Sequence, residues 1–198
     1  MQINEVLVME ENINAILSSV SESVRNNVAM CIELFSHIRW KKILVTIPMI
    51  PKPSQRPRLC GYRVYVPGAS KNAAFFEKNV LPTMNGLFIS TPCKIKLDIY
   101  APIPPSFTNT QKCLADMKIL RPWAHTGDID NYAKSALDMI QPNEKRGHTG
   151  ILYDDSLVID LQTSKYYSSS PRYELVITYM DKIPDKLMSS LRLKNIQH

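Results

Sequence analysis

The sequence predicts an α+β fold, with a mixed β-sheet packed with helices and an extra helix at the N-terminus. The first observation is the order of elements, which runs helix, strand, hairpin arm, helix, strand, long loop, helix, hairpin and helix. The second is periodicity, because residues 92–101 and 172–180 alternate apolar with polar residues, whereas 10–38 and 129–140 repeat apolar residues every three or four positions.

Composition points to a globular protein with a polyanionic partner. The 198 residues are 44% hydrophobic and 21% charged, which is ordinary for one domain plus extensions, and the net charge is +6. The four cysteines contain no C-x-x-C pair, so neither a zinc site nor a disulfide framework is predicted. No apolar run approaches the ~18 residues of a membrane span, and the polar start lacks signal-peptide features. We therefore expect a cytoplasmic protein with neither a membrane partner nor a small-molecule cofactor.

Residues 1–40 are predicted to form an acidic helical extension, with one long helix over 10–38. The charged residues of 1–38 are almost all acidic: Glu5, Glu10, Glu11, Glu22 and Glu33 against Arg25. Electrostatics would not place such a helix against DNA. We expect it to pack on the core or at a dimer contact, with a separate partner-binding role as the alternative.

Residues 39–78 are strongly basic. A strand is predicted over 42–50, and Pro48, Pro51, Pro53 and Pro57 then enforce an extended loop. The loop and the short hairpin arm at 61–66 display candidate DNA-binding cations: Lys52, Arg56, Arg58 and Arg63. A solvated basic loop with no ligand is the alternative.

A helix over 70–84 with Ser70 as N-cap and a strand over 92–101 follow. The polar side of that strand, with Lys94 and Lys96, is expected to face the substrate. The long connection 102–127 contains a short helix near 112–120 and further candidate DNA contacts: Lys112, Lys118 and Arg121. His125 is either a general base, a residue that orients another group, or an ordinary surface histidine.

The next helix carries the first acidic motif. Ile129, Tyr132, Ala133, Ala136, Leu137 and Ile140 share one face, and Asp130, Lys134 and Asp138 share the opposite one. Asp128 and Asp130 stand where this helix begins. Without a ligand, Asp128 would be an N-cap, Asp130 a first-turn anion, and Lys134 and Asp138 an exposed ion pair.

A second acidic pair interrupts the apolar segment 150–160. Asp154 and Asp155 stand where burial is otherwise expected, so a cation is the simplest compensation for their desolvation. Mg²⁺ takes carboxylate oxygens and keeps several waters, so a few carboxylates suffice. The sequence therefore predicts an acidic metal site.

The end of the chain is predicted as a hairpin and a helix. Strands over 151–167 and 172–180 are expected to pair, and Lys165 is another candidate phosphate contact. From Pro184 a short basic amphipathic helix follows. The predicted organisation is thus 1–40, a nuclease domain over 41–182, and a C-terminal helix over 183–198.

The two acidic motifs resemble those of the RusA-type Holliday junction resolvases. The matching segments are D-I-D-N-Y-A-K at 128–134 and G-I-L-Y-D-D-S at 150–156, and the resemblance extends over about 43–180. It implies Mg²⁺-binding catalytic carboxylates at Asp128, Asp130 and Asp155, a catalytic Lys134, and a supplementary role for Asp154. Mn²⁺ is a possible substitute ion. Gly127 departs from the proline common in the family.

The resemblance implies a homodimer that cuts four-way DNA junctions by paired nicks, acts in recombination and repair, and is of bacterial or phage origin. Two alternatives stay open. One is a non-catalytic DNA-binding protein whose acidic cluster is structural. The other is a phosphohydrolase acting on nucleotides, which would not need the basic loop.

Overall fold

The computed structural model describes residues 13–55, 58–60, 62–122, 126–143 and 147–191. Arg56 and His125, both named above as candidates, lie outside these ranges, and the side chain of Arg63 is not described either. The chain forms two compact units: Trp40–Met180, and Met1–Arg39 with Asp181–His198. Each unit is considered by itself below.

The larger unit is built on a four-stranded mixed sheet. Its order is β1 (Trp40–Ile47), β6 (Arg172–Met180), β4 (Cys93–Pro102) and β5 (Val158–Ser168). β6 runs antiparallel to both of its neighbours, whereas β4 and β5 are parallel. The predicted α+β class with a mixed sheet is therefore confirmed.

The expected hairpin of the last two strands is wrong. β5 and β6 are consecutive in the chain, but β4 lies between them and pairs with both. The segment between β4 and β5 contains α4 (Asn109–Asp116) and α5 (Ile129–Ile140), which is the crossover that a parallel pair needs. β5 is left as an edge strand.

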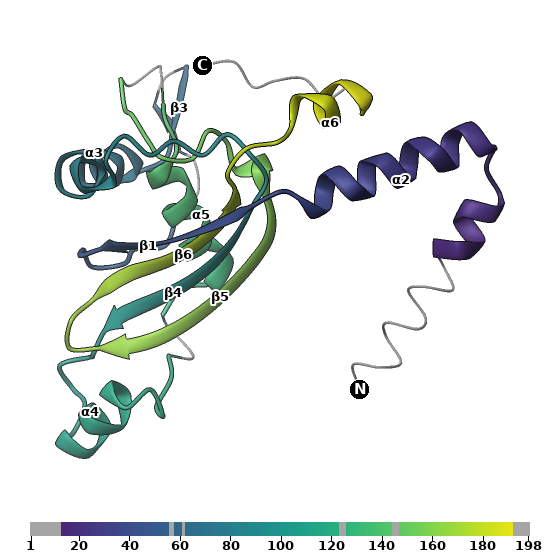
Figure 1. The fold of residues 1–198 in the computed structure, drawn as a ribbon. Coiled ribbons are helices and arrows are strands. Elements are labelled where there is room, and N and C mark those ends of the chain that lie inside the picture. Colours follow the sequence, from purple (N-terminus) through teal and green to yellow (C-terminus); the bar gives the residue numbers. More distant parts are fainter. Residues whose placement is uncertain (1–12, 56–57, 61, 123–125, 144–146, 192–198) are drawn as a thin grey trace. The chain divides into compact units, whose positions relative to one another are not determined.

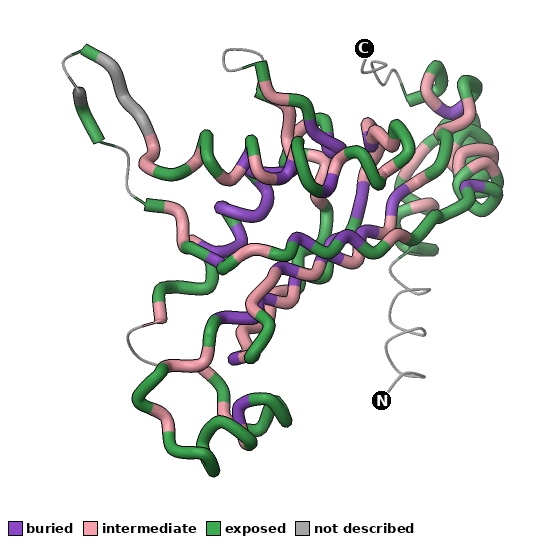
Figure 2. Tube along the Cα trace, turned by 90° about the vertical axis from the view of Figure 1, so that its left-hand side faces the viewer, coloured by how far each residue is buried: buried purple, intermediate pink, exposed green. Residues whose placement is uncertain are grey.

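Two helices cover one face of the sheet. α3 (Ala69–Asn79) packs against α5, and both lie on the same side of the sheet (Figure 1). The core forms between this pair and alternate strand residues, including Ile95, Leu97, Tyr173 and Leu175. Figure 2 shows the buried positions concentrated along this contact. Since β4 alternates buried and more exposed residues from Cys93 to Ile99, Lys94 and Lys96 point to the other face, away from α5.

Smaller elements differ from the prediction at their ends. α3 begins after Gly68, which adopts a left-handed conformation, so Ser70 is not its N-cap; α3 ends at Asn79, and a 3₁₀ turn, η1 (Leu81–Met84), follows. α4 begins earlier than expected because Thr108 and Gln111 form a capping box. The arm consists of β2 (Arg58–Cys60) and β3 (Arg63–Tyr65), which pair with each other.

The smaller unit contains α2 (Glu22–Ser36) and α6 (Asp185–Ser190), which contact each other. The predicted single helix over 10–38 is interrupted, because Ser21 caps α2 by accepting a hydrogen bond from the Val24 amide. α2 has no buried residue. In the described part of the chain, every helix is too short or too polar to cross a membrane.

Candidate active site

Gly127 fixes the entry into α5. Its φ of +76° favours glycine, and a Cβ there would lie 3.0 Å from Cγ of Pro53 and 3.2 Å from Cε2 of Tyr132. The Lys165 ammonium donates to the Gly127 carbonyl oxygen at 2.8 Å and to the Thr126 hydroxyl at 3.3 Å. Thus both close packing and a charged hydrogen bond hold the residue that precedes Asp128.

Asp128 occupies the N-cap position of α5 in an extended conformation, but its side chain makes no cap hydrogen bond. The carboxylate is exposed and is not used to satisfy the helix amides. The capping role considered as the alternative above therefore does not explain why an aspartate stands here.

The polar edge of α5 has the predicted composition. Asp130, Lys134 and Asp138 are all exposed, whereas Tyr132, Ala133, Ala136, Leu137 and Ile140 are buried as expected. Ile129 departs from the pattern with 38% exposure, because it begins the helix at its uncovered end.

Gly150 fixes the segment that carries the second acidic pair. A Cβ at this position would overlap the Ile140 carbonyl oxygen and lie 2.6 Å from the Gln141 carbonyl carbon. The Ile151 and Leu152 amides then donate to that same oxygen at 2.8 and 3.1 Å. On the other side the segment bonds to Ile89, whose amide donates to the Ile151 carbonyl oxygen at 2.7 Å.

The segment after Gly150 leads into a 3₁₀ turn, η3 (Asp155–Leu157). The continuous strand predicted from residue 151 onward is therefore wrong, because β5 begins only at Val158. Asp154 caps the turn: its Oδ1 accepts from the Ser156 amide at 2.9 Å, and hydrogen bonding to Ser156 lowers the pKa of the carboxyl. A local structural role thus accounts for Asp154. Asp155 is exposed.

Electrostatics connects Asp155 to α5. Desolvation by neighbouring residues raises the pKa of Asp138 although its side chain is still exposed to solvent, the Lys134 charge opposes that rise, and the Asp155 charge adds to it. Lys134 and Asp155 therefore both lie close enough to Asp138 for their charges to act on it. The segment that carries the second motif is hydrogen-bonded to Ile140 at the C-terminal end of α5, and the first motif lies at the start of the same helix.

The donor chemistry of this edge fits a hard divalent cation, because carboxylates are the side chains that Mg²⁺ prefers. Among the residues that the structure describes, however, no three His, Cys, Asp or Glu side chains are grouped so as to hold a metal ion. Mg²⁺ needs only one or two carboxylates when waters complete its coordination shell. Asp128, Asp130 and Asp155 are therefore suitable types of ligand, although they are not grouped around one ion position.

Several candidate DNA-binding cations already have partners. Tyr100 and Tyr166 stack with centroids 5.3 Å apart, and Arg121 Cζ lies 4.2 Å from the centre of the Tyr166 ring. Lys118 Nζ donates to the Tyr100 hydroxyl at 3.0 Å and lies about 5 Å from both rings. Lys118 and Arg121 thus hold the long connection onto the sheet.

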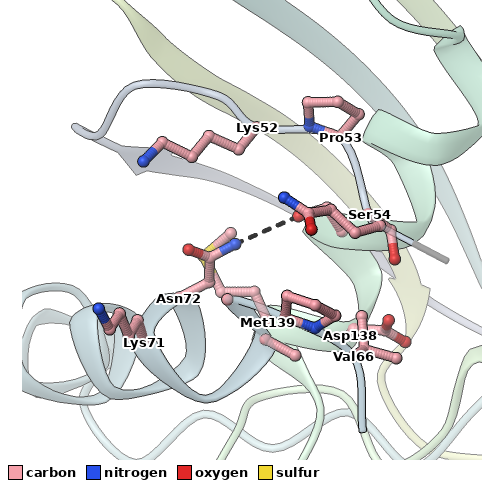
Figure 3. A pocket seen from close by; sticks show the side chains of 13 residues that line it. Lys52, Pro53, Ser54, Val66, Lys71, Asn72, Asp138 and Met139 are labelled. Atoms are coloured by element: carbon pink, nitrogen blue, oxygen red, sulfur yellow. Dashed lines mark hydrogen bonds between the residues drawn. The ribbon is translucent and has the colours of Figure 1, made fainter. Parts of the chain in front are cut away.

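The remaining cations are less constrained. Arg58 donates to the Gln55 side chain at 3.4 Å, and Lys112 is exposed on α4. Lys52 is exposed at a pocket of about 230 Å³ that also contains Lys71, Asn72 and Asp138 (Figure 3). Lys71 and Asn72 were not predicted from the sequence, since a polar helical face gives no signal of which residues line a pocket.

Comparison with known proteins gives two findings. A family model described as "Endodeoxyribonuclease RusA" matches residues 48–178, which include both acidic motifs. "Uncharacterized protein YqaN" of Bacillus subtilis (strain 168) is 37% identical over 91 residues, which are 45% of this chain and 58% of that protein. The chain thus spans a little more than half the length of this relative.

Proposed function

Because the chain belongs to the RusA endodeoxyribonuclease family, we propose that it is a Mg²⁺-dependent endonuclease that resolves Holliday junctions and other branched DNA. The observation that carries the proposal is the pair of hydrogen bonds from the Ile151 and Leu152 amides to Ile140, which join the segment that carries Asp155 to the helix that carries Lys134. Such an arrangement of carboxylates and a lysine suits phosphodiester hydrolysis.

Asp128, Asp130 and Asp155 are the proposed Mg²⁺ ligands, with Mn²⁺ as a substitute and Asp154 as a supplementary group. When bound, the ion would supply Lewis-acid stabilisation of charge on the phosphodiester and a more acidic water. Lys134 is one helical turn beyond Asp130 and exposed, so its ammonium can approach a phosphate oxygen and stabilise negative charge as it develops.

The proposed substrate has two-fold symmetry, and the proposed active form is a homodimer that makes one nick per subunit in recombination and repair. The net charge of +6 supports a polyanionic partner. We place the enzyme in the cytoplasm of a bacterium or phage-infected cell.

The test is cleavage of a synthetic four-way junction by the purified protein with Mg²⁺, Mn²⁺ or EDTA. We expect paired nicks with either ion and none with EDTA. Asp130→Asn should lose cleavage while still binding the junction in Ca²⁺. Wild-type protein that binds the junction but never cuts it would overturn the proposal.

A non-catalytic DNA-binding protein is the second candidate, and the cap that Asp154 forms on η3 favours it, because that bond gives one acidic residue a structural role. Mg²⁺ discriminates between the two, because an ion that binds only the folded state raises the melting temperature. The nuclease requires such a rise in the wild type and its loss in Asp155→Asn. No rise at all would support the second candidate.

A further inference from the structure

A polar pocket opens next to the candidate active site. One wall is the extended segment that includes Lys52, another is the N-terminal part of α3 with Lys71 and Asn72, and the floor is α5 with Ser135 and Asp138. Figure 3 shows Lys52 and Lys71 reaching from opposite walls toward the same side of the pocket, with Asp138 on the other side.

The walls of the pocket are fixed to the rest of the domain. The buried Tyr173 hydroxyl accepts from the Lys52 amide at 3.0 Å and donates to the Lys52 carbonyl oxygen at 3.1 Å. Burial raises the pKa of Tyr173 to about 12, so this hydroxyl keeps its proton at neutral pH. The next contact along the wall is the Ser54 amide, which donates to the Asn131 carbonyl oxygen at 2.8 Å.

The opposite wall is fixed in the same way. Asn72 Nδ2 donates to the Ser135 hydroxyl at 3.3 Å, which joins α3 to α5 across the floor (Figure 3). The pocket thus exists without a ligand, and a ligand would not have to order its walls.

The charges of the pocket select an anion. Lys52 and Lys71 supply two ammonium groups, and α3 begins at the pocket with no side-chain cap, so its positive dipole end adds to them. Among the described residues of the lining, the acidic side chain is that of Asp138, on the side away from the lysines. Asp138 also belongs to the polar edge of α5, so the pocket borders that edge.

The volume limits the size of the ligand. Pockets that enclose a drug-sized molecule measure about 300–1,000 Å³. At about 230 Å³ this pocket is smaller, and suits a phosphate with part of its sugar better than a whole nucleotide.

We propose that this pocket binds one backbone phosphate of the DNA strand, a neighbour of the phosphate that is cut, between Lys52 and Lys71. Asn72 and Ser135 are the neutral polar side chains next to it. The inference rests on the proposed nuclease function for the identity of the polyanion, and it adds a second anchoring point beside the reacting phosphate.

The first experiment measures how junction affinity depends on salt, in Ca²⁺ so that no cleavage occurs. One neutralised phosphate contributes a log–log slope of about −0.9 on duplex DNA. If Lys52 and Lys71 share one phosphate, Lys52→Met/Lys71→Met should flatten the slope by about 0.9. An unchanged slope overturns the proposal, and so does a change of about 1.8, because two separate phosphates would then be bound.

Lys78→Met/Lys186→Met is the matched control. It removes the same charge from α3 and α6 at exposed residues outside the pocket lining, and should leave the slope unchanged. Lys52 and Lys71 are exposed too, so we expect both double variants to keep the wild-type melting temperature.

The second experiment locates the phosphate. Junctions with a single neutral methylphosphonate at each position flanking the cut should show one position that raises KM for wild-type protein. A methylphosphonate at that position should not raise KM further for Lys52→Met/Lys71→Met. An equal rise in KM for the wild type and the double variant would contradict the proposal. Failure of the wild type to cut would reject the nuclease function but leave the salt-slope result to decide the pocket.

Discussion

Two glycines decide where the acidic side chains of this protein lie. Gly127 combines a left-handed φ with contact to Pro53, and Gly150 packs directly on the backbone that ends α5. Any larger residue at Gly150 would separate the 150–156 segment from Ile140 and thereby move Asp155. The resemblance to the nuclease family includes Gly150, and its structural reason is this backbone contact.

We expect Gly150→Ala to lower the free energy of unfolding by about 1–3 kcal/mol, because the added Cβ overlaps backbone that has no room to move. Urea unfolding measures the change. Gly86→Asn is the control, since Gly86 has a φ of +73° with open space around it, a conformation that asparagine tolerates. Equal stability of Gly150→Ala and wild type would contradict the close packing.

Asp138 provides a pH-dependent prediction. Desolvation by neighbouring residues raises its pKa, so the folded protein holds this proton at higher pH than the unfolded chain does. The stability it contributes is fully present below the ordinary pKa of 3.8 and is lost as pH rises through the raised value. We therefore expect Asp138→Asn to be more stable than wild type at about pH 7 in metal-free buffer, and equally stable at about pH 3.

The measurement is again urea unfolding, now at both pH values. Asp160→Asn removes the same charge from an exposed position on β5 and serves as the control. A variant at position 138 that is less stable than wild type at about pH 7 would show that the charged form is favoured in the folded state.

At the scale of elements, Arg121 and Gly127, on the two described parts of the connection from α4 to α5, both contact the edge strand β5. Lys165 and Tyr166 are adjacent in β5 and therefore point to opposite faces of the sheet. Arg121 lies over Tyr166 on one face, and Lys165 bonds to Gly127 on the other. Both cations were predicted to contact DNA, and in the structure each has a partner within the domain, Tyr166 for Arg121 and Gly127 for Lys165.

We expect Lys165→Met to slow junction cleavage while leaving the salt dependence of junction binding unchanged, because the ammonium positions Gly127 rather than a phosphate. A hydrogen bond from a charged donor contributes about 1.5–3 kcal/mol, so a lower melting temperature should accompany the loss. Lys112→Met, at an exposed residue of α4, is the comparison. If the salt dependence of junction binding were flattened by about 0.9 in Lys165→Met, Lys165 would instead bind a DNA phosphate.

The elements themselves were largely predictable, because periodicity is local. β4, β6 and α5 stand close to where alternation and helical spacing placed them. The pairing of strands was not predictable in this way: β5 and β6 look like a hairpin in sequence, but the parallel pairing of β4 with β5 depends on a crossover of more than fifty residues. Likewise, no pattern in the sequence shows that Asn72 meets Ser135 or that Tyr173 holds Lys52.

At the scale of the whole molecule, the two acidic motifs predicted the residues of the candidate site, and the structure shows which contacts fix the segments that carry them. Both acidic segments are anchored to the two ends of α5, one through Gly127 and Lys165 and the other through Gly150 and Ile140. A rigid helix therefore sets the spacing between them. The proposed phosphate pocket shares Asp138 with this edge, so binding and chemistry would depend on the same helix.

The central claim is that Asp130 and Asp155 act in one site. The most direct measurement is the single-turnover rate of four-way-junction cleavage at saturating Mg²⁺ for wild type, Asp130→Asn, Asp155→Asn and the double variant. Residues that act as a unit give strongly non-additive losses. We predict that each single change slows cleavage about a hundredfold or more, and that the double variant is no slower than the slower single one. A double variant whose loss equals the product of the single losses, or an Asp155→Asn protein that cuts at the wild-type rate, would contradict the claim.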